Sequence, residues 1–179
     1  DTILQTFRTI IEVVAQLETL ALIESTAASI WFRESGLAFF GSLTLHSLAM
    51  ALVVGINLAI ALRVLRLVPA FALKPLMHFY RIHWIAVILI FLSGLALLLA
   101  YPAKALTNPV FYAKFAMLSA GLIIASKLQE KIHIQSDDEL DSRTVRLMAT
   151  ASIFVWVGTI TTGRFLAYTN SVLLASRFF

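Results

Sequence analysis

Four segments of the chain are long and apolar enough to cross the hydrocarbon core of a lipid bilayer, which takes about 20 residues in a helix. They are residues 37–62, 82–103, 110–126 and 145–168. Their few charged residues lie near the segment ends. Because backbone groups find no water inside lipid, each spanning segment must satisfy its own hydrogen bonds as a helix. We therefore expect an all-α fold, an integral membrane four-helix bundle over residues 36–170, followed by a C-terminal tail at 171–179.

The composition agrees with a membrane protein. Hydrophobic residues make up 60% of the chain and charged residues 13%, whereas soluble domains average about 45–50% apolar and about 25% charged residues. A soluble domain with so little charge could not cover its apolar surface, and a disordered chain would be poor in apolar residues. The chain has no Cys, which excludes disulfide scaffolds, thiolate metal sites and thiol catalysis.

The first 35 residues differ from the four segments and predict interfacial helices. Apolar residues at steps of three and four form one helical stripe, and polar residues form the opposite face. Glu12 and Glu18 would be costly at membrane depth, so residues 1–23 predict an amphipathic helix that lies in the interface or docks on a partner protein. A second short piece, residues 25–34, presents Ile30, Trp31 and Phe32 as an interfacial anchor.

The basic charge is interpreted as membrane anchoring. The net charge is +4 and the pI is about 9.7, but the basic residues flank the apolar segments, where they meet lipid phosphates. No basic patch is interleaved with exposed aromatic residues, so we expect no nucleic-acid partner. The loops after the first and third segments, together with Arg146 at the start of the fourth segment, hold eight of the 14 basic residues. The positive-inside rule then predicts that both of these loops face the cytoplasm and that both termini lie outside.

His46 is the residue that most indicates chemistry. It lies about four residues from the centre of the first segment, about 6 Å from the bilayer midplane on the outer side at 1.5 Å per residue. A His at this depth needs a partner, a ligand or a cavity. It would ligate haem iron or another metal, or form a hydrogen bond with a quinone. The alternative is a neutral imidazole bonded to a neighbouring helix.

Lys114 and Arg164 share the predicted outer leaflet with His46. Each lies about four residues inside the outer end of its segment. One His below two cations would suit a haem with one axial ligand and with its propionates paired to the cations. The same group would suit a quinone head group or an anionic lipid. The alternative is that both cations extend to lipid phosphates.

The other histidines indicate less. His83 lies on the inner side of the second segment, about 20 Å from His46 along the membrane normal, which argues against a haem shared by the two. His78 and His133 lie near the level of His83, close to the acidic run at 137–141, but without a diagnostic metal-ligand spacing. They are interpreted as interfacial residues.

Small residues recur at every fourth position on two segments. They are Ser47, Ala51, Gly55 and Ala59 on the first, and Thr159, Gly163 and Ala167 on the fourth. Such stripes let helices approach closely in lipid. We expect partners among other membrane protein subunits, reached through these faces and through residues 1–23, besides the lipid bilayer itself.

Several short segments resemble a known family. They are residues 32–35, 45–50 with Gly55, 93–95, 108–111 with Lys114, and 163–168. Through them residues 24–168 resemble an uncharacterised family of bacterial four-helix membrane proteins, which is distantly similar to the membrane domain of copper-resistance protein D and to small b-type cytochromes. The resemblance implies a helical bundle with a role in redox or metal handling. The absence of Cys and of a clustered Met motif argues against copper.

The sequence thus predicts a non-catalytic membrane subunit of a redox or electron-transfer complex. His46, Lys114 and Arg164 would line an outer-leaflet site for haem b or quinone, with His46 as the metal ligand in the haem case. One alternative is a cofactor-free structural or accessory subunit of a larger membrane complex. Another is copper or small-solute transport, which would require oligomers because four helices are few for a pore.

Overall fold

The computed structural model describes residues 5, 8, 12, 15, 18–68, 73–134 and 142–175, and every regular element within them is a helix. Four of these helices are long and apolar enough to cross a membrane. They are α3 (Gly36–Val64), α5 (Phe79–Ala100), α7 (Pro109–Ile134) and α8 (Arg143–Ala175). The prediction of an all-helical chain with four such helices is confirmed. Helix α8 continues to Ala175, so part of the segment assigned to a tail is helical.

Three short helices connect or flank the long ones: α2 (Ala27–Glu34), α4 (Leu73–Met77) and α6 (Pro102–Leu106). The second apolar segment ends at Ala100 rather than residue 103, because Pro102 starts α6 at a position where proline needs no amide hydrogen. Helix α2 begins after Thr26, whose hydroxyl accepts a hydrogen bond from the Ser29 amide at 3.3 Å. The stripe predicted within residues 1–23 and the acidic run at 137–141 lie mostly outside the described residues.

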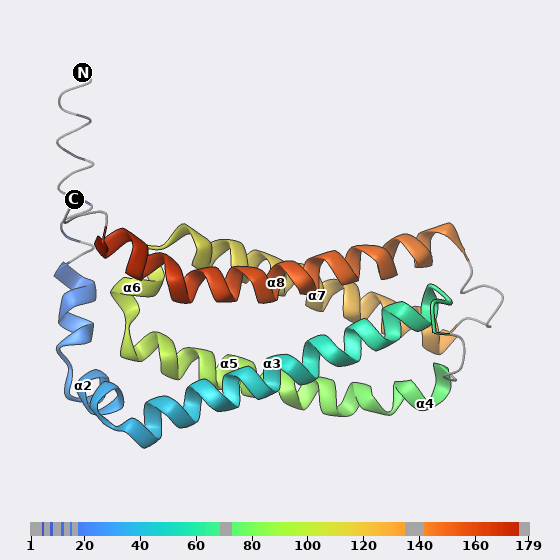
Figure 1. Ribbon diagram of the computed structural model, residues 1–179, viewed down its shortest axis with the longest axis horizontal. Helices are drawn as coiled ribbons and strands as arrows, with labels where there is room; N and C mark the ends of the chain where they lie inside the picture. Colours follow the sequence, from blue (N-terminus) through green and yellow to red (C-terminus); the bar gives the residue numbers. More distant parts are fainter. Residues whose placement is uncertain are drawn as a thin grey trace.

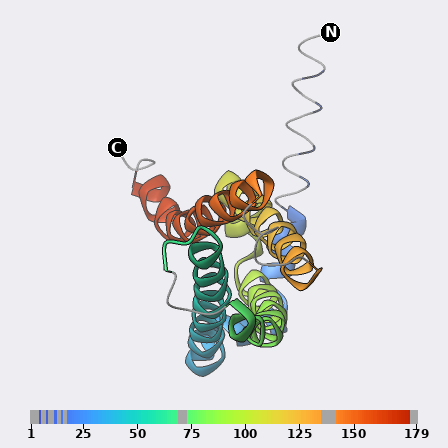
Figure 2. The same ribbon diagram turned by 90° about the vertical axis from the view of Figure 1, so that its right-hand side faces the viewer.

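The long helices pack as two antiparallel pairs. Helix α3 packs along α5, α7 packs along α8, and the two pairs meet mainly where α3 contacts α8. Figure 1 shows the pairs side by side, with α6 at one end and α4 at the other. Figure 2 shows the four helices almost end-on. We refer to the two ends of the molecule as the α6 end and the α4 end.

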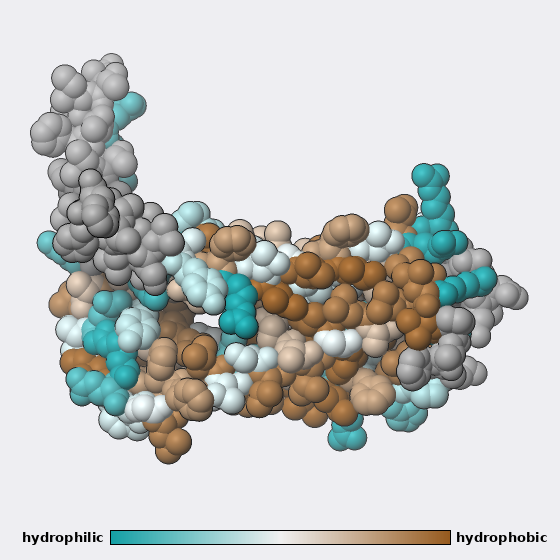
Figure 3. All heavy atoms as spheres, viewed as in Figure 1, coloured by the Kyte–Doolittle hydropathy of each residue, from teal (hydrophilic) through white to brown (hydrophobic). Residues whose placement is uncertain are grey.

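The interior is filled unevenly between the two ends. On the α6 side, burial stops at Ala49 in α3, Leu118 in α7 and Thr159 in α8, and in α5 no residue between Ser93 and Ala100 is buried. Figure 3 shows an opening there between the α3–α5 pair and the α7–α8 pair. We call this part the open half, and the level of Ala49 and Ser93 its floor.

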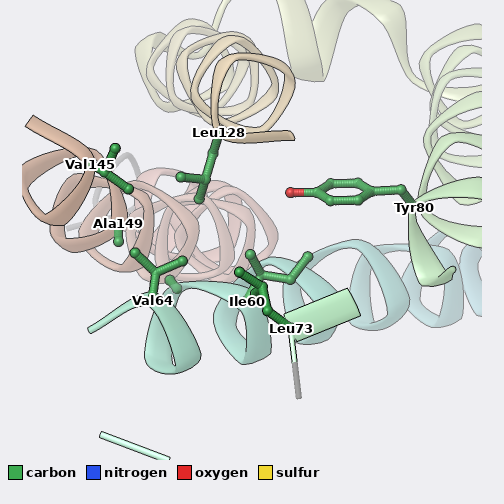
Figure 4. Close-up of a cluster of buried hydrophobic side chains, with 8 residues drawn as sticks. Ile60, Val64, Leu73, Tyr80, Leu128, Val145 and Ala149 are labelled. Carbon is green, nitrogen blue, oxygen red and sulfur yellow. The ribbon is translucent and has the colours of Figure 1, made fainter. Parts of the chain in front are cut away.

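The packed half, toward the α4 end, holds two apolar clusters. One lies next to the floor, where Val53, Ile90 and Trp156 are buried together. The other lies at the α4 end, where Ile60 and Val64 meet Leu128, Val145 and Tyr80 (Figure 4). These side chains join all four long helices, so the packed half holds the pairs together without help from the open half.

Helix α2 closes the α6 end by bonding to the end of α5. The Ser29 hydroxyl, which is fully buried, donates to the Leu99 carbonyl at 2.9 Å. The Arg33 guanidinium donates to the Ala100 carbonyl at 3.2 Å and to the Glu24 carbonyl at 2.7 Å. These donors satisfy carbonyls that the last turn of a helix leaves without partners. We call this contact the α2 clamp.

Candidate functional site

His46 on α3 and Ser93 on α5 form a hydrogen bond at the floor of the open half. Their Nδ1 and Oγ atoms lie 3.0 Å apart. The Ser93 hydroxyl has one proton, which it donates to a backbone carbonyl of its own helix, Leu89 or Ile90. Its oxygen must therefore accept from His46, which assigns the proton to Nδ1 and leaves a lone pair on Nε2.

A glycine allows the imidazole to lie directly on α5. A methyl group built at Gly94 would approach Cε1 of His46 to 3.3 Å and Nδ1 to 3.7 Å. The absence of a side chain at Gly94 thus brings the ring within hydrogen-bonding distance of Ser93. The orientation of His46 is set by two consecutive residues of α5.

Lys114 on α7 approaches the other side of the imidazole. Its Nζ atom lies 3.5 Å from Nε2 of His46, the nitrogen with the lone pair. The aliphatic part of Lys114 lies against Gly163 of α8, where a methyl group would be 3.6 Å from Cε and 3.7 Å from Nζ. Four helices therefore contribute to one polar group, and we call His46, Ser93 and Lys114 the floor triad.

The floor triad is accessible only in part. Ser93 is buried, whereas His46 and Lys114 are half-buried. The lone pair of Nε2 and the lysine head thus lie at the boundary between the packed half and the open half. In the part of the chain that the structure describes, Lys114 has no ion pair with an acidic side chain among its interactions. A ligand that offers an electron-rich atom to the Lys114 ammonium and a hydrogen-bond donor or a metal ion to Nε2 of His46 would complement both groups.

Arg164 does not join the floor triad. It follows Gly163 on α8, so a helical rotation of about 100° turns its side chain away from Lys114. Arg164 is exposed, and within the described residues it makes no hydrogen bond to His46 or Lys114. The structure therefore brings together two of the three residues predicted from the sequence.

The site predicted from the sequence does not include Ser93, Gly94 or Gly163. The first two segments must run antiparallel, and this arrangement places Ser93 at the depth of His46. A comparison of depths along the two segments could therefore have identified Ser93. The close approach at Gly94 has no such signal, because glycines are common in membrane helices for packing alone. Gly163 is in the stripe on the fourth segment, and it receives the lysine side chain.

His83 lies far from His46, as the depth argument predicted. Ten residues of α5 separate it from Ser93, which corresponds to about 15 Å. The imidazole is fully buried in the packed half, and neither ring nitrogen has a hydrogen-bond partner among the residues that the structure describes. Within the described ranges no three His, Asp or Glu side chains come together to hold a metal ion.

The two small-residue stripes face different surroundings. On α3, Ser47, Ala51, Gly55 and Ala59 are all exposed, and a methyl group at Gly55 would meet nothing within 4 Å. On α8, Thr159 is buried and Gly163 lies against Lys114. Ala167, the third member of the α8 stripe, is exposed. Part of the α8 stripe thus packs within the chain, whereas the α3 stripe faces outward.

Four helices of spanning length around an internal polar group define a helical membrane protein. The chain belongs to the family described as "Family of unknown function (DUF6644)", whose model matches residues 15–169. No curated protein matches the chain, and no solved structure does.

Proposed function

We propose that this chain is a subunit of a membrane redox or electron-transfer complex and that its floor triad holds haem b or a quinone head group. The observation that supports the proposal is the approach of His46 Nε2 and Lys114 Nζ to 3.5 Å at the floor of the open half. The opening seen in Figure 3 lies in the open half, and these two polar groups lie at its floor.

In the haem case, His46 would be the axial ligand through Nε2. Its Nδ1 hydrogen bond to Ser93 is the type of contact that fixes the tautomer of metal-bound histidines. Lys114 would turn from Nε2 toward a propionate, whereas Arg164, which faces away from the floor triad, would not take the role that the sequence predicted for it. The bound haem would supply one-electron chemistry.

In the quinone case, Lys114 would donate a hydrogen bond to a head-group carbonyl. Its positive charge would stabilise the negative charge that a quinone gains on reduction. His46, bonded to Ser93, would hold the lysine in place through Nε2. The apolar tail would extend into the open half toward lipid.

The proposal includes a location and an orientation. We assign the chain to the inner membrane of a bacterium as a four-helix bundle, with the α6 end outside and the α4 end in the cytoplasm. Arg63, Arg66, Arg143 and Arg146 lie at or near the α4 ends of α3 and α8, which supports this orientation by the positive-inside rule. Both termini would then be outside, with residues 1–23 as an amphipathic contact to partner subunits.

The test is cofactor analysis of the full chain purified in detergent. A reduced-minus-oxidised spectrum with pyridine haemochrome quantification measures haem, and solvent extraction followed by chromatography measures quinone. We compare wild type with His46→Gln and Lys114→Met. The matched controls are His78→Gln and Lys104→Met, because both residues are exposed and lie outside the floor triad.

The two cofactors give different results. Stoichiometric haem that is lost in His46→Gln but retained in His78→Gln supports the haem case. Stoichiometric quinone that is lost in Lys114→Met but retained in Lys104→Met supports the quinone case. A folded wild-type protein with neither cofactor contradicts the proposal.

The second candidate is a cofactor-free structural or accessory subunit. The outward stripe of α3 favours it, because Gly55 and its small neighbours leave a smooth surface for another helix. Gly55→Leu would then dissociate the chain from its complex in native gels, whereas Leu52→Ile, an exposed neighbour, would leave the complex intact. Intact complexes with Gly55→Leu would contradict this candidate.

A further inference from the structure

Tyr80 and His83 on α5 carry an unusual concentration of unsatisfied polar atoms. In the part of the chain that the structure describes, four buried side-chain nitrogen or oxygen atoms lack a hydrogen-bond partner. Three of them belong to this pair: the Tyr80 hydroxyl and both ring nitrogens of His83. Tyr80 is 2% exposed and His83 is 0% exposed, so bulk water does not reach either group.

The two side chains lie on one face of α5. They are three residues apart, and their ring centroids are 5.8 Å from each other in an edge-to-face arrangement. Figure 4 shows the Tyr80 hydroxyl directed into the space between Ile60 of α3 and Leu128 of α7. It therefore points into the interior of the packed half and not to the surface.

A polar side chain in contact with this pair is already bonded elsewhere. Trp84 lies edge-on to His83 with a centroid distance of 5.0 Å. Its indole nitrogen donates to the Gln129 side chain at 3.1 Å, so this N–H group does not donate to His83. At about the same level of α3, the buried Asn57 donates its amide to the Val53 carbonyl at 2.8 Å.

Buried polar groups in folded proteins have partners, and those without a protein partner are bonded to ordered water. We propose that Tyr80 and His83 form an internal water site within the packed half. A neutral imidazole has one donor and one acceptor, and a phenol has both, so a molecule that can donate and accept is required. Water has this property and is the small molecule that ordinarily bonds buried polar groups without protein partners.

This site is distinct from the floor triad and does not depend on the proposed redox function. About 15 Å of α5 separates His83 from Ser93. Between them, Ala86, Val87 and Ile90 are buried in the apolar cluster next to the floor. An experiment that contradicts the cofactor proposal therefore does not contradict the water site, and the reverse also holds.

Nuclear magnetic resonance of the imidazole nitrogens tests the proposal. The full chain is labelled with ¹⁵N-histidine and reconstituted in lipid nanodiscs, and its four histidines give few signals. His83→Phe assigns the signals of His83. We expect a cross-peak between a His83 ring nitrogen and bound water, together with a chemical shift of a hydrogen-bonded nitrogen.

Two variants decide whether Tyr80 shares the water. Tyr80→Phe removes only the hydroxyl and should weaken the water cross-peak of His83 at least several-fold. His78→Phe changes an exposed residue near the start of the same helix and should leave the cross-peak unchanged. His83 nitrogens with shifts of an unbonded ring and no water cross-peak would overturn the proposal. A cross-peak unaffected by Tyr80→Phe would overturn the shared site.

Discussion

The indole of Trp156 lies against the backbone of Gly121 with no space for a side chain between them. A methyl group at Gly121 would come within 3.0 Å of two indole carbons and within 3.3 Å of a third. Trp156 is fully buried, so the ring cannot turn outward without emptying the centre of the packed half. This contact fixes how closely α7 approaches α8.

We therefore predict that Gly121→Ala destabilises the protein by about 1–3 kcal/mol, the usual cost of forcing extra atoms into a packed core. The free energy of unfolding in mixed detergent micelles measures this effect. Gly55→Ala is the matched control, because nothing lies within 4 Å of a methyl group there. Equal stability of the two variants would show that α7 and α8 move apart easily.

Ser93→Ala should weaken a haem bound at the floor triad by about 10- to 100-fold, the typical effect of removing a residue that orients a metal-binding histidine. The cause is the loss of the acceptor that holds the proton of His46 on Nδ1. Haem titration followed at the Soret band measures the affinity. Ser119→Ala is the control, since this exposed serine bonds only within α7. Unchanged affinity in Ser93→Ala would contradict the assigned role.

Gly94→Ala and Gly163→Ala should have opposite effects. At Gly94 the added methyl group meets His46 at 3.3 Å, and the imidazole is held by Ser93 and Lys114, so the His46–Ser93 bond, worth about 1 kcal/mol, is weakened. At Gly163 the contact is 3.6 Å or more, and the better helix propensity of Ala adds roughly 0.5–1 kcal/mol. Thermal unfolding and the His46 imidazole resonances report both changes. A more stable Gly94→Ala variant with unshifted His46 signals would show that the added methyl group fits beside the imidazole of His46.

The α2 clamp should slow the exchange of backbone amide hydrogens with solvent at the end of α5. Ser29→Ala removes a buried hydroxyl that bonds to Leu99, and we expect a loss of about 1 kcal/mol with faster hydrogen exchange over residues 98–106. Lys104→Ala, which changes an exposed residue of α6, should leave the exchange rates unchanged. Similar rates in the Ser29→Ala variant and wild type would indicate that α6 holds this end without α2.

The sequence predicted the features that depend on local composition. The four long helices follow from apolar length, and His46 stands out because a polar side chain is rare at that depth. The contact of Lys114 with His46 agrees with the predicted grouping at one level. Depth in the membrane did not predict whether Arg164 joins the site, because two residues at one depth can point to different sides of a helix.

Other features depend on how helices pack, which composition does not reveal. Apolar residues face both lipid and core in a membrane helix, so no pattern distinguished the packed half from the open half. For the same reason the sequence did not show that the stripe on α3 faces outward, nor that Thr159 and Gly163 of the α8 stripe face inward while Ala167 is exposed. The unsatisfied atoms of Tyr80 and His83 became visible only once the neighbouring side chains were placed.

Because the interior is filled unevenly, the residues that stabilise the fold and the residues of the proposed binding site lie in different halves of the molecule. Apolar contacts that join all four helices lie in the packed half, so substitutions there should disturb the fold more than substitutions along the open half. Regions of low local stability are also those that open most readily, so the proposed cofactor would enter from the side through the open half. Relatives with the same core could therefore differ in what they bind.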